Sequence, residues 1–261
     1  MPRKMITRDT VHVISHPKAG RTWLRLLLSL YLQGHFEIDW PKEKWLELQG
    51  LPEANSDVPH FHFTHDRNSH LKPLEAAKDK SMYADNRVIY MVRDPRDVIV
   101  SNYFQQNRRE PVLRDAPAFA GSISEYVRHK QWGIAHDVGL MNQWEESRHV
   151  PRKFRLVRYE DLHLLSSAVM VGVLVFVGMR SLNLNLLQNV IEQCSFANMQ
   201  ALERTDALNS GRLRPTNYND PESFKVRRGI VGGYVDYLSK ADIDYVNQEM
   251  EELDDFYGYE V

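Results

Sequence analysis

The sequence contains only one cysteine, Cys194, so no disulfide can form within the chain. Neither sign of charge dominates, because 33 lysine and arginine residues stand against 35 aspartate and glutamate residues, a formal net charge of -2. A lone cysteine fits a reducing compartment, and the lack of a basic surplus argues against a nucleic-acid partner. Any site for an anion must therefore be built from local groups.

Long apolar runs are also absent. The two most apolar stretches, Leu24–Leu32 and Ala168–Gly178, are too short to span a bilayer, and Arg25 interrupts the first. We expect both to be buried helices. The first residues, Met1 to Thr10, are charged and lack the apolar core of a secretory signal. The expectation is a cytoplasmic protein without a membrane span.

Short runs rich in β-branched and aromatic residues predict four strands, each followed by a polar loop. These strands are Val11–Ile14, Phe61–Thr64, Arg87–Val92 and Phe154–Arg158. Helical patterns cover Thr22–Leu32, Pro41–Gln49, Pro95–Gln106, Ser122–His136, Met141–Arg148, Tyr159–Val177, Asn183–Cys194, Ser195–Arg204 and Ser239–Leu253. This alternation is typical of an α/β fold with a mostly parallel sheet and helices on both faces.

No repeat, linker or low-complexity tract divides the chain. We therefore expect a single domain over residues 1–261, with its core at about residues 11–253. Residues 206–222 are rich in Asn, Asp, Ser, Gly and Pro and predict a mobile loop. Sheets of this kind bind ligands at the carboxyl ends of their strands. The loops that follow the four strands should consequently share one edge.

The first of these loops, His16–Trp23, reads His-Pro-Lys-Ala-Gly-Arg-Thr-Trp. A loop between a strand and a helix presents free backbone N–H groups and the positive end of the helix dipole. Gly20 permits close approach of an anion, Lys18 adds a mobile charge, and Thr22 adds a hydroxyl. The lysine precedes the glycine, unlike the ATP-binding pattern G-x-x-x-x-G-K-[ST]. An ordinary loop with a surface lysine and a core tryptophan is the alternative.

This segment resembles the 5′-phosphosulfate loop of the sulfotransferases that use 3′-phosphoadenosine 5′-phosphosulfate (PAPS), with a pattern close to Tyr-Pro-Lys-Ser-Gly-Thr-Thr-Trp. The chain matches it at Pro17, Lys18, Gly20, Thr22 and Trp23 and departs from it at Ala19 and Arg21. The resemblance implies a cradle of Lys18, Ala19, Gly20, Arg21, Thr22 and Trp23. In it, Lys18 would hold the bridging oxygen and Trp23 would stack near adenine. Arg21 would add a charge contact or point to solvent.

A second part of the resemblance concerns the 3′-phosphate. The family has an arginine at a strand end and a serine eight residues later, and this chain has Arg93 and Ser101 at that spacing. An arginine fork suits phosphate oxygens, although a helical serine can also bond to its own backbone. The intervening Arg96 and Asp97 are expected to be solvated or paired with each other.

A third part is the segment Arg227-Arg228-Gly229-Ile230-Val231-Gly232, which resembles the family's Arg-Lys-Gly-x-x-Gly signature. The resemblance implies that Arg227, Arg228 and Gly229 close over the 3′-phosphate. The family continues with Asp-Trp, whereas this chain has Gly233-Tyr234. A basic surface turn is the alternative. The similarity runs in order from about Val11 to Tyr234.

Two aromatic residues complete the adenine site implied by the resemblance. Tyr159 opens a Tyr-Glu-Asp segment, and Phe196 follows Cys194-Ser195 where the family has Thr-Ser-Phe. Either aromatic ring could also belong to the core.

His65, in Phe63-Thr64-His65-Asp66, is the candidate general base, because the segment resembles the family's Lys-Thr-His. Histidine titrates near neutrality, which suits a base. His60, His62 and His70 are nearby alternatives. No matching set of carboxylates or cysteines accompanies them, so no metal is expected. Phe63 replaces the family lysine, which removes one cation from this position.

The resemblance implies a P-loop NTPase-like sulfotransferase fold and transfer of a sulfuryl group from PAPS to a hydroxyl, or an amine, of a small-molecule or glycan acceptor. The product would be adenosine 3′,5′-bisphosphate (PAP), with Lys18 and His65 as catalytic residues. The alternatives are a P-loop-type small-molecule kinase and a catalytically inactive nucleotide-binding module. The stretch from Val235 does not match the family's dimer motif, so no oligomeric state is predicted.

Overall fold

Four parallel strands form the central sheet of the computed structural model, which describes residues 10–115 and 117–260. They lie in the order β2-β1-β3-β4. Their bounds are β1 Val11–Ser15, β2 Phe61–Thr64, β3 Arg87–Val92 and β4 Lys153–Arg158. Each strand lies within one residue of its predicted bounds. The expected α/β fold is confirmed, while the domain bounds stay a prediction and their ends include residues outside the described part.

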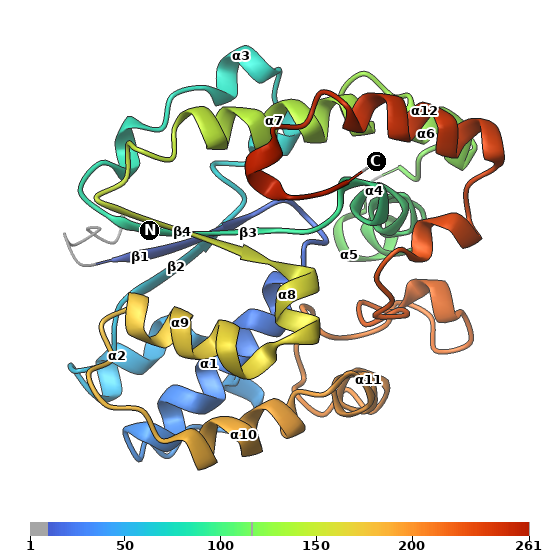
Figure 1. Cartoon of the computed structure of the whole chain (residues 1–261). Helices are drawn as coiled ribbons and strands as arrows, with labels where there is room; N and C mark the ends of the chain where they lie inside the picture. The colour runs from blue at the N-terminus through green and yellow to red at the C-terminus, as the bar shows by residue number, and fades with distance from the viewer. Residues whose placement is uncertain (1–9, 116, 261) are drawn as a thin grey trace.

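Helices cover both faces of the sheet (Figure 1). The lower layer in that view consists of α1 Arg21–His35, α2 Leu51–Ala54, α8 Tyr159–Leu164, α9 Ser166–Phe176, α10 Leu184–Gln193 and α11 Phe196–Arg204. The upper layer consists of α3 Leu74–Ala77, α4 Pro95–Phe104, α5 Glu110–Arg114, α6 Ile123–Val127, α7 Ile134–Glu146 and α12 Lys240–Met250.

The alternation of side chains along β3 gives each layer its own core. Ile89 and Met91 belong to the cluster shared with α1, whereas Val88 and Tyr90 belong to the cluster shared with α7 and α12. A strand buried on both faces requires the nearly continuous apolar run found in β3. This double burial explains why β3 is the clearest strand in the sequence.

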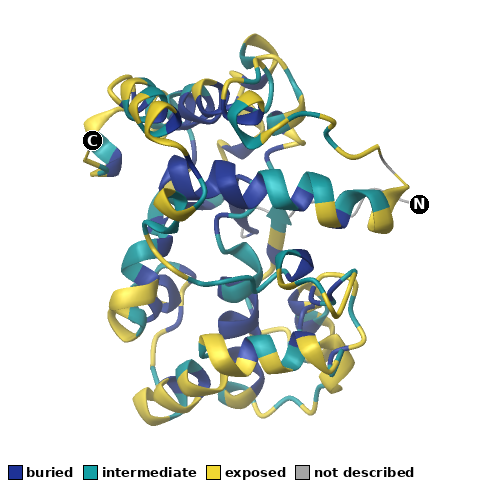
Figure 2. Cartoon of the chain, turned by 90° about the vertical axis from the view of Figure 1, so that its right-hand side faces the viewer, coloured by how far each residue is buried: buried dark blue, intermediate teal, exposed yellow. Residues whose placement is uncertain are grey.

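The chain changes direction between β1 and β3, and this change positions the site. α1 leaves β1 toward the lower layer, while α4 leaves β3 toward the upper layer (Figure 1). Such a switch point opens a crevice at the carboxyl edge of a parallel sheet. Figure 2 looks onto this end of the molecule, where buried and intermediate segments surround the strand ends.

Two predicted helices are wrong in detail. Residues 41–49 form 3-10 turns, Lys42–Lys44 and Leu48–Gly50, because the carbonyls of Lys44 and Leu46 accept side-chain hydrogen bonds from elsewhere. Residues 122–136 do not form one helix. α6 ends at Val127, and turns follow in which His129 Nδ1 accepts from the backbone N–H groups of Gln131 and Trp132. Gly133 then begins α7, which continues to Glu146.

The apolar stretch 168–178 is a helix, as expected, but it is buried on one face only. Met170, Val173 and Leu174 of α9 are buried, whereas Val175 is 58% exposed. Tyr159–Val177 is also divided into α8 and α9 at Leu165. Within the described residues, no helix has both the length and the apolar character needed to cross a membrane.

The segment 206–222 consists of turns and loop, and its last two residues begin the 3-10 turn Pro221–Ser223. Contacts with the turn after α4 hold it, because Arg109 Nη1 donates to Arg214 O at 2.8 Å and Thr216 Oγ1 donates to Arg108 O at 2.6 Å. Its mobility stays a prediction.

Candidate active site

The loop after β1 passes twice through the left-handed backbone region, at Lys18 (φ 70°) and Gly20 (φ 93°). No side chain caps the start of α1, so N–H groups of its first turn remain available to an anion. A Cβ on Gly20 would lie 2.6 Å from Cδ2 of Tyr159 and 2.9 Å from Cε of Met91. Glycine is therefore required both by the backbone and by the packing of Tyr159 on the loop.

Lys18 Nζ donates a hydrogen bond of 3.2 Å to Gln105 Oε1, in the π-helical turn Gln105–Arg109 that follows α4. Burial, together with the charges of Lys225 and Arg109, holds the pKa of Lys18 well below its ordinary value. A cation in such surroundings gains a favourable interaction when an anion binds. The loop thus has the electrostatics of an anion site.

Arg21 and Ser15 hold the candidate base, His65, from two sides. His65 Nδ1 lies 2.7 Å from Ser15 O, and because a carbonyl only accepts, Nδ1 carries the proton. Arg21 Nη2 lies 2.7 Å from His65 Nε2 and donates to it. Burial and the Arg21 charge lower the pKa of His65 to about 2. His65 is consequently neutral, with its basic lone pair on Nε2. Arg21 thus contacts His65 and does not point to solvent, while a charge contact with the donor stays a prediction.

The neighbouring histidines occupy different surroundings. His62 lies beside His12, with 5.1 Å between ring centroids, and His12 itself packs on Tyr83 of the upper core. His70 packs edge-on against His65, with centroids 5.2 Å apart. Among these rings, only His65 combines the Ser15 and Arg21 contacts.

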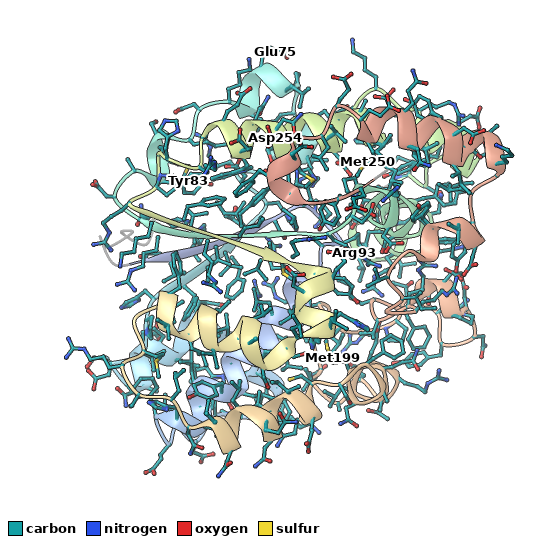
Figure 3. The ribbon with its side chains drawn as sticks, in the orientation of Figure 1. Glu75, Tyr83, Arg93, Met199, Met250 and Asp254 are labelled. Atoms are coloured by element: carbon teal, nitrogen blue, oxygen red, sulfur yellow. The ribbon has the colours of Figure 1, made fainter. Side chains whose placement is uncertain are left out.

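Arg93 follows the last residue of β3 and stands at the carboxyl edge of the sheet (Figure 3). Its Nη2 donates to Asp97 Oδ2 at 3.1 Å and to Ile230 O at 2.9 Å, and its guanidinium lies 4.4 Å from the Tyr159 ring centroid. Ser101 lies buried two turns further along α4. Arg93 therefore joins α4, α8 and the segment 230–234.

Asp97 and Arg96 are not solvated or paired with each other, which corrects the expectation. Asp97 is buried and accepts from the backbone N–H groups of Gly232 at 2.9 Å and Tyr234 at 3.0 Å. Arg96 instead pairs with Asp94 at 2.8 Å, because Asp94 caps α4 and turns its carboxylate toward the helix. Asp97 thereby fastens the 230–234 segment to α4.

The two arginines of the third motif differ in position. Arg227 lies over the Phe104 ring at 4.7 Å and donates to Glu222 Oε2 at 2.8 Å. Arg228 pairs with Asp236 at 2.6 Å, on a more exposed surface. Arg227 is therefore the more enclosed of the two arginines and Arg228 the more exposed.

The predicted adenine residues gather around the first loop. Trp23 Nε1 donates to Cys194 O at 2.9 Å, and the Trp23 ring lies 5.8 Å from that of Tyr159. A Cβ on Gly229 would lie 2.4 Å from Phe196 Cδ2, so these two motifs touch. Phe196 remains 39% exposed, which leaves one of its surfaces available for a ligand.

The family model of the sulfotransferase domain matches residues 8–256 of this chain. The chain belongs to the sulfotransferase family. This confirms the resemblance drawn from the motifs.

Three proteins illustrate the relationship of this sulfotransferase to others. It is 27% identical over 258 residues to a flavonol sulfotransferase-like protein of Flaveria bidentis, covering 93% of this chain and 80% of that one. It is 23% identical over 256 residues to cytosolic sulfotransferase 12 of Arabidopsis thaliana, covering 92% and 76%. Retinol dehydratase, solved in a complex with retinol and PAP, has a TM-score of 0.65 at 18% identity, covering 95% and 81%.

Two residues beside Arg109, Glu203 and Lys225, were not singled out from the sequence of this sulfotransferase. Glu203 is fully buried, accepts from the backbone N–H of Lys225 at 2.5 Å and pairs with Arg109 at 3.4 Å. Lys225 has no side-chain hydrogen bond or ion pair with any described residue, and its pKa is lowered to about 8 by burial and then by Arg109 and Arg21. The only available signal was that Lys225 precedes the Arg227 motif by two residues.

Two donors suggest how the site would receive an anionic nucleotide. Arg21 Nη1 and Arg93 Nε are buried without a hydrogen-bond partner in the described part of the chain. Buried donors usually have partners, so a ligand with acceptor oxygens at both places fits these residues. Across residues 10–115 and 117–260, no three His, Cys, Asp or Glu side chains are grouped as a metal site.

Proposed function

We propose that this sulfotransferase transfers a sulfuryl group from PAPS to a hydroxyl group of a small-molecule acceptor, with His65 as general base. The observation that carries the proposal is the pair of contacts on His65. Ser15 O accepts the proton on Nδ1, so the basic lone pair is on Nε2, which lies beside the guanidinium of Arg21. The PAP bound to retinol dehydratase supports the choice of donor.

The donor would be held by groups from several elements. The uncapped turn after Ala19 and Gly20, with Lys18 and Thr22, would bind the 5′-phosphosulfate. The 3′-phosphate would lie against Arg93, Ser101, Arg227 and Gly229, with Arg228 at the rim. Adenine would lie among Trp23, Tyr159 and Phe196.

PAPS supplies an activated sulfuryl group on a phosphate leaving group. His65 Nε2 would take the proton of the acceptor hydroxyl as the new O–S bond forms and the old S–O bond breaks. The proton then resides on Nε2, while Nδ1–H stays on Ser15 O. Lys18 would stabilise the phosphate oxygen released with PAP.

The acceptor is proposed to be a small alcohol or phenol, because retinol is the ligand recorded with PAP in the similar dehydratase. Glycan hydroxyls and amines remain as further acceptors for the same test. We also propose a cytoplasmic location, supported by the cytosolic relative of Arabidopsis thaliana and by the single cysteine, which is buried.

Transfer of label from radioactive PAPS to a panel of alcohols, phenols, sugars and amines tests the function directly. Calorimetry on the same protein should show tight binding of PAP and weak binding of ATP. The opposite order of affinities would favour the kinase alternative. PAP binding without transfer to any acceptor would favour the inactive module.

A further inference from the structure

Lys225 lies in a segment whose backbone is held tightly. Glu203, a buried residue at the end of α11, accepts from Lys225 N at 2.5 Å and from Val226 N at 2.7 Å. Arg109 Nη1 neutralises the same carboxylate at 3.4 Å and also donates to Ser223 O at 2.6 Å. These contacts fix where the Lys225 side chain begins.

The π-helical turn Gln105–Arg109 places this segment beside Lys18. Gln105, at the start of the turn, accepts from Lys18 Nζ, and Arg109, at its end, pairs with Glu203. The Arg227 guanidinium lies over Phe104, the residue before the turn. Lys18 and Arg227 therefore contact the side chains of the adjacent residues Gln105 and Phe104, and Lys225 is linked to the same turn through Glu203 and Arg109.

Lys225 and Val226 form a bend between the buried residues Ser223 and Phe224 and the arginine Arg227. Val226 packs against the core beneath the sheet. Arg227, after the bend, lies over the ring of Phe104, so the chain leaves the bend beside the turn that contacts Lys18. The charge of Lys225 acts on both Lys18 and His65, which agrees with a side chain directed toward these two residues.

The ammonium of Lys225 has cations around it and no acidic partner of its own. Lys18, Arg21 and Arg109 are its positive neighbours. The two nearby carboxylates are engaged elsewhere: Glu203 with backbone amides and Arg109, and Glu110 with Gln105 and Arg114. Such a repulsive arrangement is favourable only when an anion occupies the space between the cations.

We infer that Lys225 is a further catalytic residue, which binds the peripheral oxygens of the sulfuryl group during its transfer. This assignment rests on the proposed function. In an in-line transfer, charge is spread over the peripheral oxygens, and a cation placed there stabilises the transition state. Phe63, on the strand that leads to His65, offers an apolar ring and no such charge.

The test compares turnover with PAP binding, because PAP keeps both phosphates and lacks the sulfuryl group. Lys225→Met should lower kcat by about tenfold to a hundredfold, while the Kd for PAP changes by less than about threefold. Lys225→Arg should recover part of the lost kcat. The matched control is Lys240→Met, which removes an exposed lysine paired with Asp244 and should leave kcat unchanged.

The pH profile provides a readout that a purely structural role would not move. Lys225 loses its charge as the pH rises through its pKa of about 8, so kcat/KM of the wild type should fall on that side. In Lys225→Arg this fall should move to higher pH, because arginine stays charged. Other groups near Lys225 that could titrate are Lys18 and His65, and both are present in the variant.

Three results would overturn the inference. An unchanged kcat in Lys225→Met would remove Lys225 from the reaction, with sulfuryl transfer by the wild type still demonstrated. A loss of PAP affinity as large as the loss of kcat would make Lys225 a phosphate ligand. Absence of transfer by the wild type to any acceptor would remove the proposed function and this role with it. If thermal unfolding shows that Lys225→Met is not folded, the same comparison is made with Lys225→Gln and with the pH profile of Lys225→Arg.

Discussion

Arg21 Nη2 lies 2.7 Å from His65 Nε2, so the first turn of α1 directly contacts the imidazole that follows β2. The same contact keeps the imidazole neutral, because the guanidinium charge adds to the effect of burial on its pKa. An acceptor hydroxyl would have to share or replace this donor at Nε2. Arg21 is therefore a positioning residue whose removal should alter the pH dependence of the reaction.

Arg21→Met should lower kcat about tenfold or more, since a charged donor to the base is lost. Without the Arg21 charge, the pKa of His65 rises from about 2 toward its ordinary value. Protonated His65 cannot accept a proton, so kcat/KM should fall at a higher pH on the acidic side than in the wild type. Steady-state rates between pH 5 and 8, roughly the stable range of most proteins, would measure this change.

Arg148→Met is the control for Arg21→Met, because Arg148 forms an exposed ion pair with Glu145 far along α7. Its profile should coincide with that of the wild type. An acidic limb that does not move in Arg21→Met would show that Arg21 leaves the base unaffected.

His65→Ala should reduce kcat by about a hundredfold or more, the usual range for loss of a general base. PAP binding should persist, because the contacts of His65 are to Ser15 and Arg21. Turnover and calorimetry on the same preparation separate the two effects. A nearly normal rate would transfer the role of base to another residue, with His70 the first to examine because its ring packs on His65.

Arg93→Ala should weaken PAP binding by about tenfold to a hundredfold, since a charge-assisted contact to the 3′-phosphate is lost. The wild type should prefer PAP to adenosine 5′-monophosphate, and the variant should lose most of that preference. Calorimetry with both nucleotides distinguishes this from a general loss of folding. Equal losses for both ligands would mean that Arg93 acts through Asp97 and Ile230 instead of through the 3′-phosphate.

Three glycine substitutions separate backbone strain from collision in the cradle. Gly20→Ala introduces both effects, because its φ is 93° and its Cβ would lie 2.6 Å from Tyr159. The substitution should lower the free energy of unfolding by about 1–3 kcal/mol and should also weaken PAP binding. Gly232→Ala meets only the unfavourable φ of 74°, and Gly211→Ala meets neither. Urea unfolding should rank their stabilities in that order, lowest first. A Gly20→Ala protein as stable as Gly211→Ala would contradict the structure of the loop.

The sequence allowed the sheet to be predicted because its strands are short apolar runs with clear ends. The sequence also predicted a site at the carboxyl edge of the sheet, since Lys18, Arg93 and His65 each follow a strand. Parallel strands bring such positions together whatever the length of the intervening chain. The motifs did not reveal that the buried carboxylates of Asp97 and Glu203 hold the backbone of distant segments.

What the sequence could not show depends on contacts between distant segments. Asp97 bonds to residues 232 and 234 and Glu203 to residue 225, and neither pairing has a local pattern. The break in the helix predicted over residues 122–136 is local instead, because His129 Nδ1 accepts from the backbone N–H groups of Gln131 and Trp132 after α6 ends at Val127. Lys225 went unnoticed because a lysine near an arginine motif is common on any surface.

The pairing of Glu203 with residues 225 and 226 has a consequence for variation among related enzymes. It closes a ring of chain around residues 206–222, so the two ends of that loop are held at a constant separation. The loop between these two ends can be lengthened, shortened or exchanged at modest entropic cost. Such exchanges would leave Lys225 where it is. The fold therefore offers a segment that can vary among relatives while the position of Lys225 is preserved.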